Sequence, residues 1–238
     1  MVIEDKFKKQ LNVFGIELTK TQEQMFDKYY GYLFRWNNFV NLTGITEKKE
    51  VYEKHFLDSL SFVKVIEMGG SQRLLDVGTG AGFPGIPLKI VFPELQVVLL
   101  DSLRKRVDFL EEVVKELGLE AISCVHGRAE ELAREEGYRQ GFDLVTSRAV
   151  ADLSVLSEYA LPFVKVGGSF VAYKSANAKE EVEKSFRAIE LLGGKIKEEI
   201  IFNLPDTKVE RMLLRIEKVL DTPSEYPRRV GKPLKKPL

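Results

Sequence analysis

The stretch RLLDVGTGAGFPGIP, residues 73–87, joins an apolar run to a bend crowded with glycine and proline. Leu74 and Leu75 lead to Asp76, after which four glycines and two prolines follow within eleven positions. Glycines at the end of a strand allow the backbone to pass very close to a ligand. The stretch therefore predicts the first strand of an open α/β sheet, followed by a ligand-binding loop.

Downstream of this loop, short apolar runs alternate with amphipathic ones. The predicted strands are residues 73–77, 96–101, 121–126, 142–148 and 168–175, and the clearest helices between them are 85–92 and 103–117. This alternation is typical of a parallel sheet with right-handed crossovers. The runs 194–204 and 209–219 predict an antiparallel hairpin at one edge. We therefore expect an α/β fold with a mostly parallel, seven-stranded sheet.

The chain divides into three predicted parts. Residues 1–68 form a helical extension, because apolar side chains recur every three or four positions along 21–40 and a second helix follows a cap at Thr46. Residues 69–220 form the α/β domain. Residues 221–238 form a proline-containing basic tail without regular structure.

Composition excludes several classes of protein. The 238 residues are 44% hydrophobic and 30% charged, which is typical of a globular domain. No apolar run approaches the roughly 18 residues that a membrane span requires, and no signal core begins the chain. With Cys124 as the one cysteine and no metal-ligand spacing around His55 or His126, we expect a cytoplasmic monomer without disulfide, metal or membrane contact.

The glycine spacing points away from a phosphate ligand. The loop reads Gly78-x-Gly80-x-Gly82, but the dinucleotide fingerprint needs a glycine where Phe83 stands, and no P-loop lysine follows. Asp76, two residues before the first glycine, is a poor neighbour for a pyrophosphate and suits a positively charged ligand. S-adenosylmethionine carries an ammonium and a sulfonium and no phosphate, so we expect it here. Alone, the spacing also fits a tight turn in any nucleotide-binding sheet.

Two further strand ends carry acids suited to a nucleoside. Asp101 ends the second strand, where an acid accepts hydrogen bonds from both ribose hydroxyls. After the third strand, the backbone at Ala129 and the carboxylate of Glu130 are placed to read the adenine edge. Both acids have simpler interpretations, because Asp101 can cap the helix that opens at Leu103 and Glu130 can stabilise a first helical turn.

The segment after the fourth strand bears on the methyl acceptor. It reads TSRAVADL, without the Asn/Asp-Pro-Pro-Tyr that accompanies exocyclic amines, and the chain has no Pro-Cys pair for cytosine C5. These absences favour an acceptor with an available lone pair, such as guanine N7, and in-line transfer by positioning without a general base. Arg148 is placed to hold a purine edge, a phosphate or the ligand carboxylate. Alternatively, it pairs with a helix terminus or a surface acid.

Longer motifs carry a family resemblance. WNNFVNLTGIT, HFLDSL, LLDVGTGAGFPGIPLKIVFPE, SRAVADL and YPRRVGKPLKKPL resemble the GidB family of bacterial small-subunit ribosomal RNA guanine-N7 methyltransferases over residues 30–238. The resemblance implies a Rossmann-like, class I S-adenosylmethionine-dependent methyltransferase fold. It implies N7-methylation of one guanine in 16S ribosomal RNA, with that RNA or the small ribosomal subunit as partner. The positions that match the family's cofactor contacts are Gly78, Phe83, Ala129, Glu130 and Arg148.

One face of the second predicted helix is polar. His55, Asp58 and Ser59 fall at helical spacing opposite its apolar stripe, so they are predicted to line the cleft, with His55 and Asp58 joining Arg148 as catalytic residues and Ser59 contacting RNA. A histidine in such a position also serves as a local hydrogen-bonding partner. Asn38 and Asn41 either offer hydrogen bonds to bases or simply end the preceding helix.

The tail concentrates positive charge. Residues 226–238 contain five bases and no acid, while the rest of the chain carries 31 bases against 36 acids. The five are Arg228, Arg229, Lys232, Lys235 and Lys236. We expect an extended arm that binds RNA phosphates, whose removal weakens RNA binding and leaves cofactor affinity nearly unchanged. A solvated terminus without a partner is the alternative.

Three other functions compete with this interpretation. A nicotinamide oxidoreductase would share the ribose-binding acid, but Phe83 and Asp76 argue against it. A non-catalytic RNA-binding module would keep the fold without the reaction. A methyltransferase acting on a small molecule or on another RNA is disfavoured only by the tail and the family resemblance.

Overall fold

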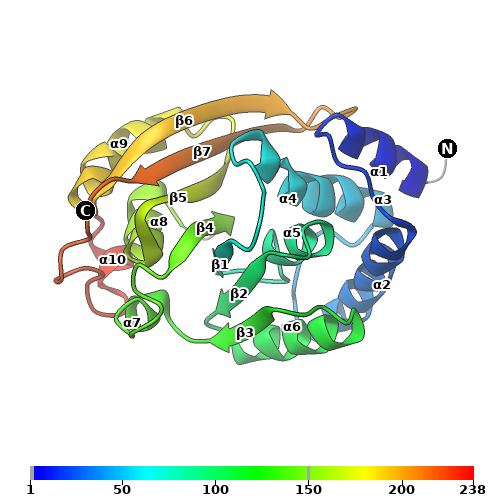
Figure 1. Ribbon diagram of the computed structural model, residues 1–238, viewed down its shortest axis with the longest axis horizontal. Coiled ribbons are helices and arrows are strands. Elements are labelled where there is room, and N and C mark those ends of the chain that lie inside the picture. The colour runs from blue at the N-terminus through cyan, green and yellow to red at the C-terminus, as the bar shows by residue number, and fades with distance from the viewer. Residues whose placement is uncertain (1–2, 149–150) are drawn as a thin grey trace.

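A computed structural model describes residues 3–148 and 151–238, so Ala149 and Val150 of the SRAVADL motif lie outside the described residues. Seven strands form one sheet in the order β3-β2-β1-β4-β5-β7-β6 (Figure 1). Their bounds are β1 Arg73–Val77, β2 Gln96–Asp101, β3 Ile122–His126, β4 Phe142–Arg148, β5 Val164–Ser175, β6 Gly194–Asn203 and β7 Glu210–Lys218.

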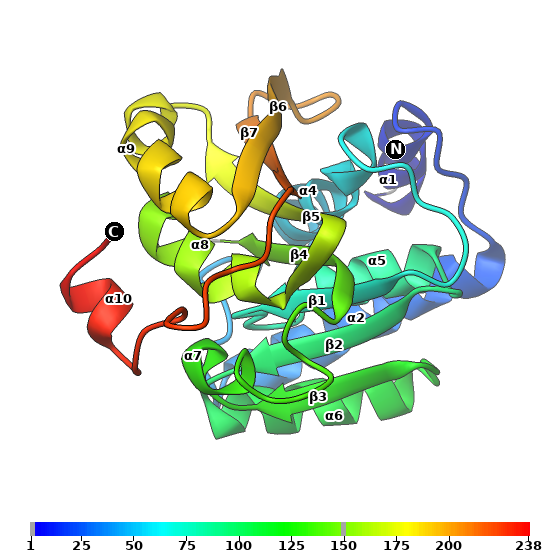
Figure 2. The same cartoon turned by 60° about the vertical axis from the view of Figure 1, so that its left-hand side comes forward.

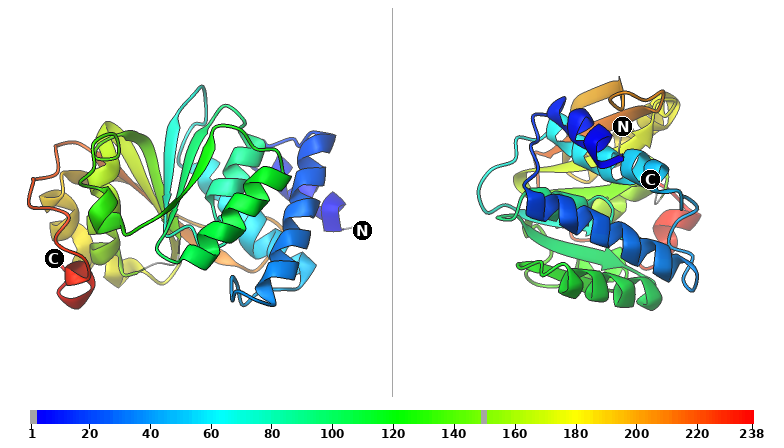
Figure 3. Two further views of the ribbon diagram at one scale, coloured as in Figure 1. Left: turned by 90° about the horizontal axis from the view of Figure 1, so that it is seen from below. Right: turned by 90° about the vertical axis from the view of Figure 1, so that its right-hand side faces the viewer.

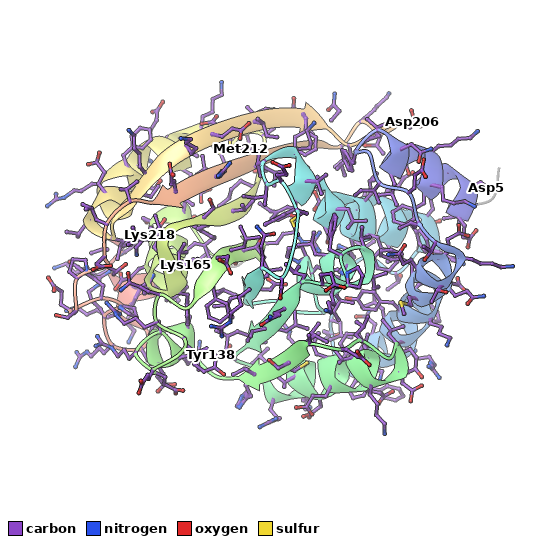
Figure 4. All side chains as sticks on the ribbon, viewed as in Figure 1. Asp5, Tyr138, Lys165, Asp206, Met212 and Lys218 are labelled. Carbon is purple, nitrogen blue, oxygen red and sulfur yellow. The ribbon has the colours of Figure 1, made fainter. Side chains whose placement is uncertain are left out.

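The strand directions confirm the predicted topology. β1 pairs in parallel with both β2 and β4, and β4 pairs in parallel with β5. β7 runs antiparallel between β5 and β6, so the terminal hairpin lies at one edge of an otherwise parallel sheet. Because β7 is antiparallel, its first residues lie where the parallel strands end. Met212 and Lys218, labelled in Figure 4, lie toward its beginning and at its end.

Helices cover both faces of the sheet. The α-helices are α1 Ile3–Asn12, α2 Lys20–Asn37, α3 Lys48–Val51, α4 Asp58–Leu60, α5 Gly85–Val91, α6 Arg104–Glu116, α7 Ala129–Leu132, α8 Leu153–Ala160, α9 Lys179–Leu191 and α10 Lys232–Lys235. Within the described residues, none of them has the length and apolar character of a bilayer crossing.

Alternation along the strands divides the core into two layers. Leu74 packs with the N-terminal helices, α5 and α6, whereas the next residue, Leu75, packs with α7, α8 and α9. Figure 3 shows these two groups of helices on either side of the sheet. Phe7 and Phe26 belong to the same core cluster as Leu74, and the Tyr173 hydroxyl of β5 donates to the carbonyl of Ser59, so the extension, predicted as residues 1–68, shares its core with the sheet.

The second predicted helix changes geometry along its length. After α3 the chain forms a π-helical segment at Tyr52–Leu57, then α4, then a 3₁₀ turn at Ser61–Lys64. The expected cap at Thr46 is wrong, because Glu47 occupies the N-cap position and makes no side-chain cap hydrogen bond. π-Helical segments are rare in proteins, and those that occur often lie at functional sites. This one carries His55.

The tail departs from the expectation of an extended arm. The tail folds back past α7 and α8, and its residues Lys232–Lys235 form the short helix α10 (Figures 1 and 2). Pro227 and Pro233 are buried, and Leu238 packs against the core layer on that face. The tail is thus part of the folded domain, and α10 contradicts the prediction that it lacks regular structure.

Gly82 offers a test of how tightly the loop is packed. Its φ is +96°, and an added Cβ would lie 2.5 Å from Cδ1 of Ile86 and 2.7 Å from the hydroxyl of Tyr29. Gly82→Ala should therefore lower the free energy of unfolding by about 2–5 kcal/mol, combining backbone strain with overpacking. Gly80→Ala, with φ +62° and no atom within 4 Å, should cost only about 1–2 kcal/mol.

Chemical denaturation of both variants beside the parent protein measures the difference. Equal losses at the two glycines would contradict the close packing assigned to Gly82.

Candidate active site

Most backbone N–H groups of the bend after β1 already donate hydrogen bonds to other groups of the protein. Gly78, Gly80 and Gly82 all have positive φ, which bends the chain sharply beneath the strand ends. The N–H groups of Gly78 and Thr79 donate to the carbonyl of Leu100 at 2.8 and 3.1 Å, and that of Gly82 donates to Thr79 at 3.0 Å. A loop whose N–H groups are spent in this way does not present the donor array that a pyrophosphate needs.

Asp76 holds this bend together from within the core. Its Oδ2 accepts hydrogen bonds from the Thr79 hydroxyl at 2.7 Å and the Gly85 N–H at 2.8 Å. Its Oδ1 is buried and has no partner among the described residues. Burial raises the pKa of Asp76 to about 6, although these two hydrogen bonds lower it. Asp76 is fully buried behind the loop, which does not fit the expected direct contact with the ligand.

Gly82 also lies away from the ligand side. The direction in which its Cβ would point is filled by Ile86 and Tyr29, and the Tyr29 hydroxyl donates to the carbonyl of Ala81. Gly80, by contrast, faces open space. The third glycine of the motif is therefore required for packing, whereas the first two border the cavities described next.

A small cavity of about 80 Å³ lies between the ends of β1, β2 and β3. Its wall includes Gly78, Asp101, Ala129, Glu130 and Tyr159, so four of the predicted cofactor residues come together there. They come from three separate strand ends, as expected for ligand sites of open parallel sheets. The cavity has one acid near β2 and one on α7, which suits a ligand rich in hydroxyl and amino groups.

Asp101 makes the contact with the start of α6 that its simpler interpretation predicts, and its binding to a ribose stays a prediction. Its Oδ1 accepts the N–H of Leu103 at 2.9 Å, which caps the turn before α6. Its Oδ2 accepts the Gly80 N–H at 2.9 Å and lies 3.4 Å from Arg106. The carboxylate therefore joins the glycine loop to the second strand end while it forms part of the cavity wall.

Glu130 is held by the tail. It lies in α7 with only 4% of its surface exposed, and its Oε1 accepts the Gly231 N–H at 3.0 Å. The simpler interpretation of Glu130, as a carboxylate that only stabilises the first turn of a helix, did not predict this contact with the tail. Because one oxygen is fixed by the tail, the orientation of Glu130 toward the small cavity depends on residues a hundred positions away.

A larger cavity of about 740 Å³ adjoins the same loop. Gly78 borders both cavities, and the larger one extends over the carboxyl ends of β4 and β5 toward the π-helical segment. Five cations and three carboxylates line it: Lys54, Arg106, Arg148, Lys174 and Arg211, with Asp58, Asp152 and Glu181. Each of these cations is already ion-paired with a carboxylate, so a phosphodiester bound here would compete with those acids for the cations.

Two arginines meet at one buried acid in this cavity. Asp58, 2% exposed, accepts from Nη1 of Arg148 at 2.8 Å and from Nε of Arg211 at 2.9 Å. Arg148 also donates to the carbonyl of Lys54, and its guanidinium lies 5.0 Å from the centre of the Phe83 ring. Arg148 pairs with an acid, as one sequence alternative predicted, but the acid is buried and lies on the wall of the cavity.

His55 has a defined proton position. Nη2 of Arg148 lies 3.2 Å from its Nδ1, and since arginine only donates, Nδ1 must be the unprotonated acceptor. Nε2 then carries the proton and donates to the Thr43 hydroxyl at 2.8 Å. Burial, followed by the charge of Arg148, lowers the pKa of His55 to about 3. Its ring stacks on Phe83 with centroids 4.6 Å apart, so the imidazole is neutral and positioned.

The residues on the N-terminal helices that were predicted to contact RNA differ in their exposure. Asn38 and Asn41 are exposed, at the end of α2 and in the following loop. Ser59 is completely buried and its hydroxyl donates to the carbonyl of His55 at 2.6 Å, which does not fit a direct RNA contact. Ser59 lies just after the π-helical segment, where its carbonyl accepts the Tyr173 hydroxyl of β5 at 2.6 Å.

The tail bases separate into one half-buried residue and four exposed ones. Arg228 makes a paired contact with Glu158, a fully buried acid of α8, at 2.5–3.0 Å. This contact replaces the expected phosphate contact. The exposed bases are Arg229, Lys232, Lys235 and Lys236.

The chain is similar in sequence to known proteins over nearly its whole length. The family model described as GidB, rRNA small subunit methyltransferase G, matches residues 22–208. The chain belongs to the GidB family. The protein named Ribosomal RNA small subunit methyltransferase G of Lachnoclostridium phytofermentans is 54% identical over 228 residues, covering 96% of this chain and 94% of that protein. Its namesake in Acetivibrio thermocellus is 52% identical over 225 residues, covering 94% and 92%.

Solved structures resemble this GidB chain in fold. The YcgJ protein of Bacillus subtilis has a TM-score of 0.54 at 14% identity, covering 70% of this chain and all of that one. TYW2 of M. jannaschii, solved in complex with AdoMet, has a TM-score of 0.51 at 15% identity, covering 64% and 72%. With the strand order, these likenesses confirm the expected class I methyltransferase fold.

Two residues of the GidB site were missed by the sequence interpretation. Arg211 opens β7 and reaches the cavity because the antiparallel strand starts where its parallel neighbours end. Thr43 fixes the second nitrogen of His55 from a loop between helices. β7 carries other charged residues, among them Arg215 and Glu217, so the sequence does not single out Arg211. Nothing in the spacing links Thr43 to His55. Among residues 3–148 and 151–238, no three His, Cys, Asp or Glu side chains gather as a metal site would need.

The proton position of His55 in this GidB chain is directly testable. At pH 6 the imidazole nitrogen chemical shifts should be those of a neutral ring protonated at Nε2, and they should stay so as the pH falls to 5, because the pKa is about 3. His126→Gln assigns the signals by removing the second histidine. A His55 ring that titrates between pH 6 and 7 would contradict the arrangement of Arg148 and Thr43.

Proposed function

We propose that this chain is an S-adenosylmethionine-dependent methyltransferase that modifies N7 of one guanine in 16S ribosomal RNA. The observation that carries the proposal is the family match over residues 22–208, together with relatives named for the small-subunit ribosomal RNA. The cavity of about 740 Å³ beside the glycine loop, whose wall includes five cationic side chains, supports an RNA acceptor over a small molecule. We further propose that it is a monomer and that it acts in the cytoplasm, where its RNA partner is assembled.

The residues of the small cavity fit the cofactor. S-adenosylmethionine supplies a methyl group on a positively charged sulfur. Asp101 would bind the ribose hydroxyls, and the backbone at Ala129 with Glu130 would bind the adenine edge. Gly78 and Gly80 border the space into which the methionyl part would extend. The spent N–H groups of the bend weigh against a nicotinamide dinucleotide and support this choice.

The chemistry of the larger cavity supports a ring-nitrogen acceptor. His55 has no free lone pair, because Nδ1 faces Arg148 and Nε2 is protonated toward Thr43. Each oxygen of Asp58 accepts from an arginine. Neither group is available as a general base, and guanine N7 needs none because its lone pair is already free. The remaining tasks are to orient the base in line with the donor and to exclude water.

Arg148 is the residue best placed to orient the purine. It is held by Asp58 and the Lys54 carbonyl on one side and by the Phe83 face on the other, which fixes the direction of its guanidinium. Guanidinium donors match the O6 edge of guanine in the plane of the base. In this role Arg148 touches the substrate, while His55, Asp58 and Arg211 are positioning residues.

The product identifies the reaction directly. The protein is incubated with labelled S-adenosylmethionine and 16S ribosomal RNA, and the RNA is then treated with borohydride and aniline, which cleave the chain at N7-methylguanine. We expect label in the RNA and one cleavage site that depends on the enzyme. Label without cleavage would place the methyl group on another atom, and label in small molecules alone would refute the RNA substrate.

Arg148→Ala should reduce turnover by about 10²–10³-fold, because a fixed cationic donor beside the reacting base is lost. The fold should persist, since Arg211 still pairs with Asp58. Arg104→Ala, which removes an exposed arginine from α6, is the matched control and should leave turnover unchanged. Circular dichroism verifies the fold, and a folded Arg148→Ala enzyme with normal turnover would exclude Arg148 from the site.

A further inference from the structure

The tail is anchored to the body by contacts that do not involve its exposed bases. Arg228 pairs with buried Glu158, and its own N–H donates to the same carboxylate at 2.7 Å. Arg139 donates to the carbonyls of Thr222 and Tyr226 at 2.8 and 2.9 Å. These contacts are typical of folded structure, since each satisfies a buried or half-buried polar group.

The same segment touches the small cavity at one point. Gly231, in a left-handed conformation with φ +75°, donates its N–H to Glu130 Oε1. Glu130 is almost fully buried and borders the small cavity with Ala129 and Tyr159. The tail therefore helps determine how the acid proposed to read the adenine edge is oriented.

The outer side of the segment is cationic. A cavity of about 440 Å³ between the tail and the turn after α7 is lined by Arg134, Glu225, Tyr226, Arg228, Arg229 and Lys232. Lys235 and Lys236 extend the charge along α10. Like charges this close repel one another, and phosphates bound between them would remove the repulsion and stabilise the folded-back tail.

We propose that residues 226–236, the clasp, couple RNA binding to cofactor binding. The inner contact, Gly231 to Glu130, sets the adenine side of the small cavity, and the outer bases bind RNA phosphates. RNA that occupies the outer bases holds the clasp closed and tightens cofactor binding, and by linkage the cofactor tightens RNA binding by the same factor. This inference rests on the proposed function and replaces the expectation of an arm that is independent of the cofactor.

Gly231→Val tests the inner contact. Valine does not adopt a φ of +75°, so the Gly231 N–H must turn away from Glu130, although no atom within 4 Å obstructs the new side chain. We expect the Kd for S-adenosylhomocysteine, measured by calorimetry without RNA, to rise five- to tenfold. Gly118→Val is the matched control, since Gly118 has φ +63° and open surroundings at the end of α6, far along the chain from the clasp. Its Kd should change less than twofold.

Lys232→Gln/Lys235→Gln tests the outer contact. Without RNA this double variant should bind S-adenosylhomocysteine like the parent, because neither side chain lines the small cavity. With saturating 16S ribosomal RNA the parent should bind about fivefold more tightly, and the double variant should lose this gain.

Two results would overturn the clasp: a parent Kd that RNA does not change, or equal Kd values for Gly231→Val and Gly118→Val. The methyl-transfer assay on the parent separates this inference from the proposed function. Parent enzyme that methylates RNA but shows no coupling refutes the clasp alone. Parent enzyme that transfers no methyl to RNA refutes the proposed function, while the calorimetry without RNA still decides the inner contact.

Discussion

The buried contact between Asp58 and Arg148 is the interaction on which the rest of the site depends. It joins the N-terminal helices to the end of β4, so the extension and the sheet enclose one cavity. Replacing Arg148 leaves Asp58 paired with Arg211 alone, so the loss of stability falls below the roughly 3–5 kcal/mol that a buried charge without any partner costs. The same guanidinium faces Nδ1 of His55 and thereby fixes its tautomer. One ion pair thus sets both the shape of the cavity and the absence of a free base within it.

Much of the fold could be predicted because its signals are local. Leu74 and Leu75 face opposite core layers, as strand alternation requires, and Asp101, Glu130 and Arg148 follow strands whose carboxyl ends share one edge. The topology of the sheet decides which residues lie at that edge, and the alternation of apolar runs in the sequence predicts the topology. The sequence therefore predicted which strand ends carry the site better than it predicted what each side chain does there.

The residues that departed from expectation depend on distant contacts or on local geometry that spacing does not reveal. Ser59 is buried against the sheet, where its carbonyl accepts the hydroxyl of Tyr173, more than a hundred positions later in the chain. Asp76 is turned into the core by Thr79 and Gly85. Arg228 pairs with Glu158, which lies 70 positions earlier in the chain, and nothing in the basic tail itself indicates that partner. A count of charges along the sequence cannot separate a base that is already paired from one that is free.

The distribution of charge around Gly78 explains how a chain with equal numbers of acids and bases handles two ligands of opposite sign. On one side of this glycine, Asp101 and Glu130 face the small cavity, where a cationic nucleoside is proposed to bind. On the other side, cations outnumber carboxylates in the larger cavity, where a polyanion is proposed to bind. Because a residue without a side chain separates the two, the ligands can approach each other closely while each remains in surroundings of opposite charge. In-line transfer requires this closeness, and net charge alone would never have indicated it.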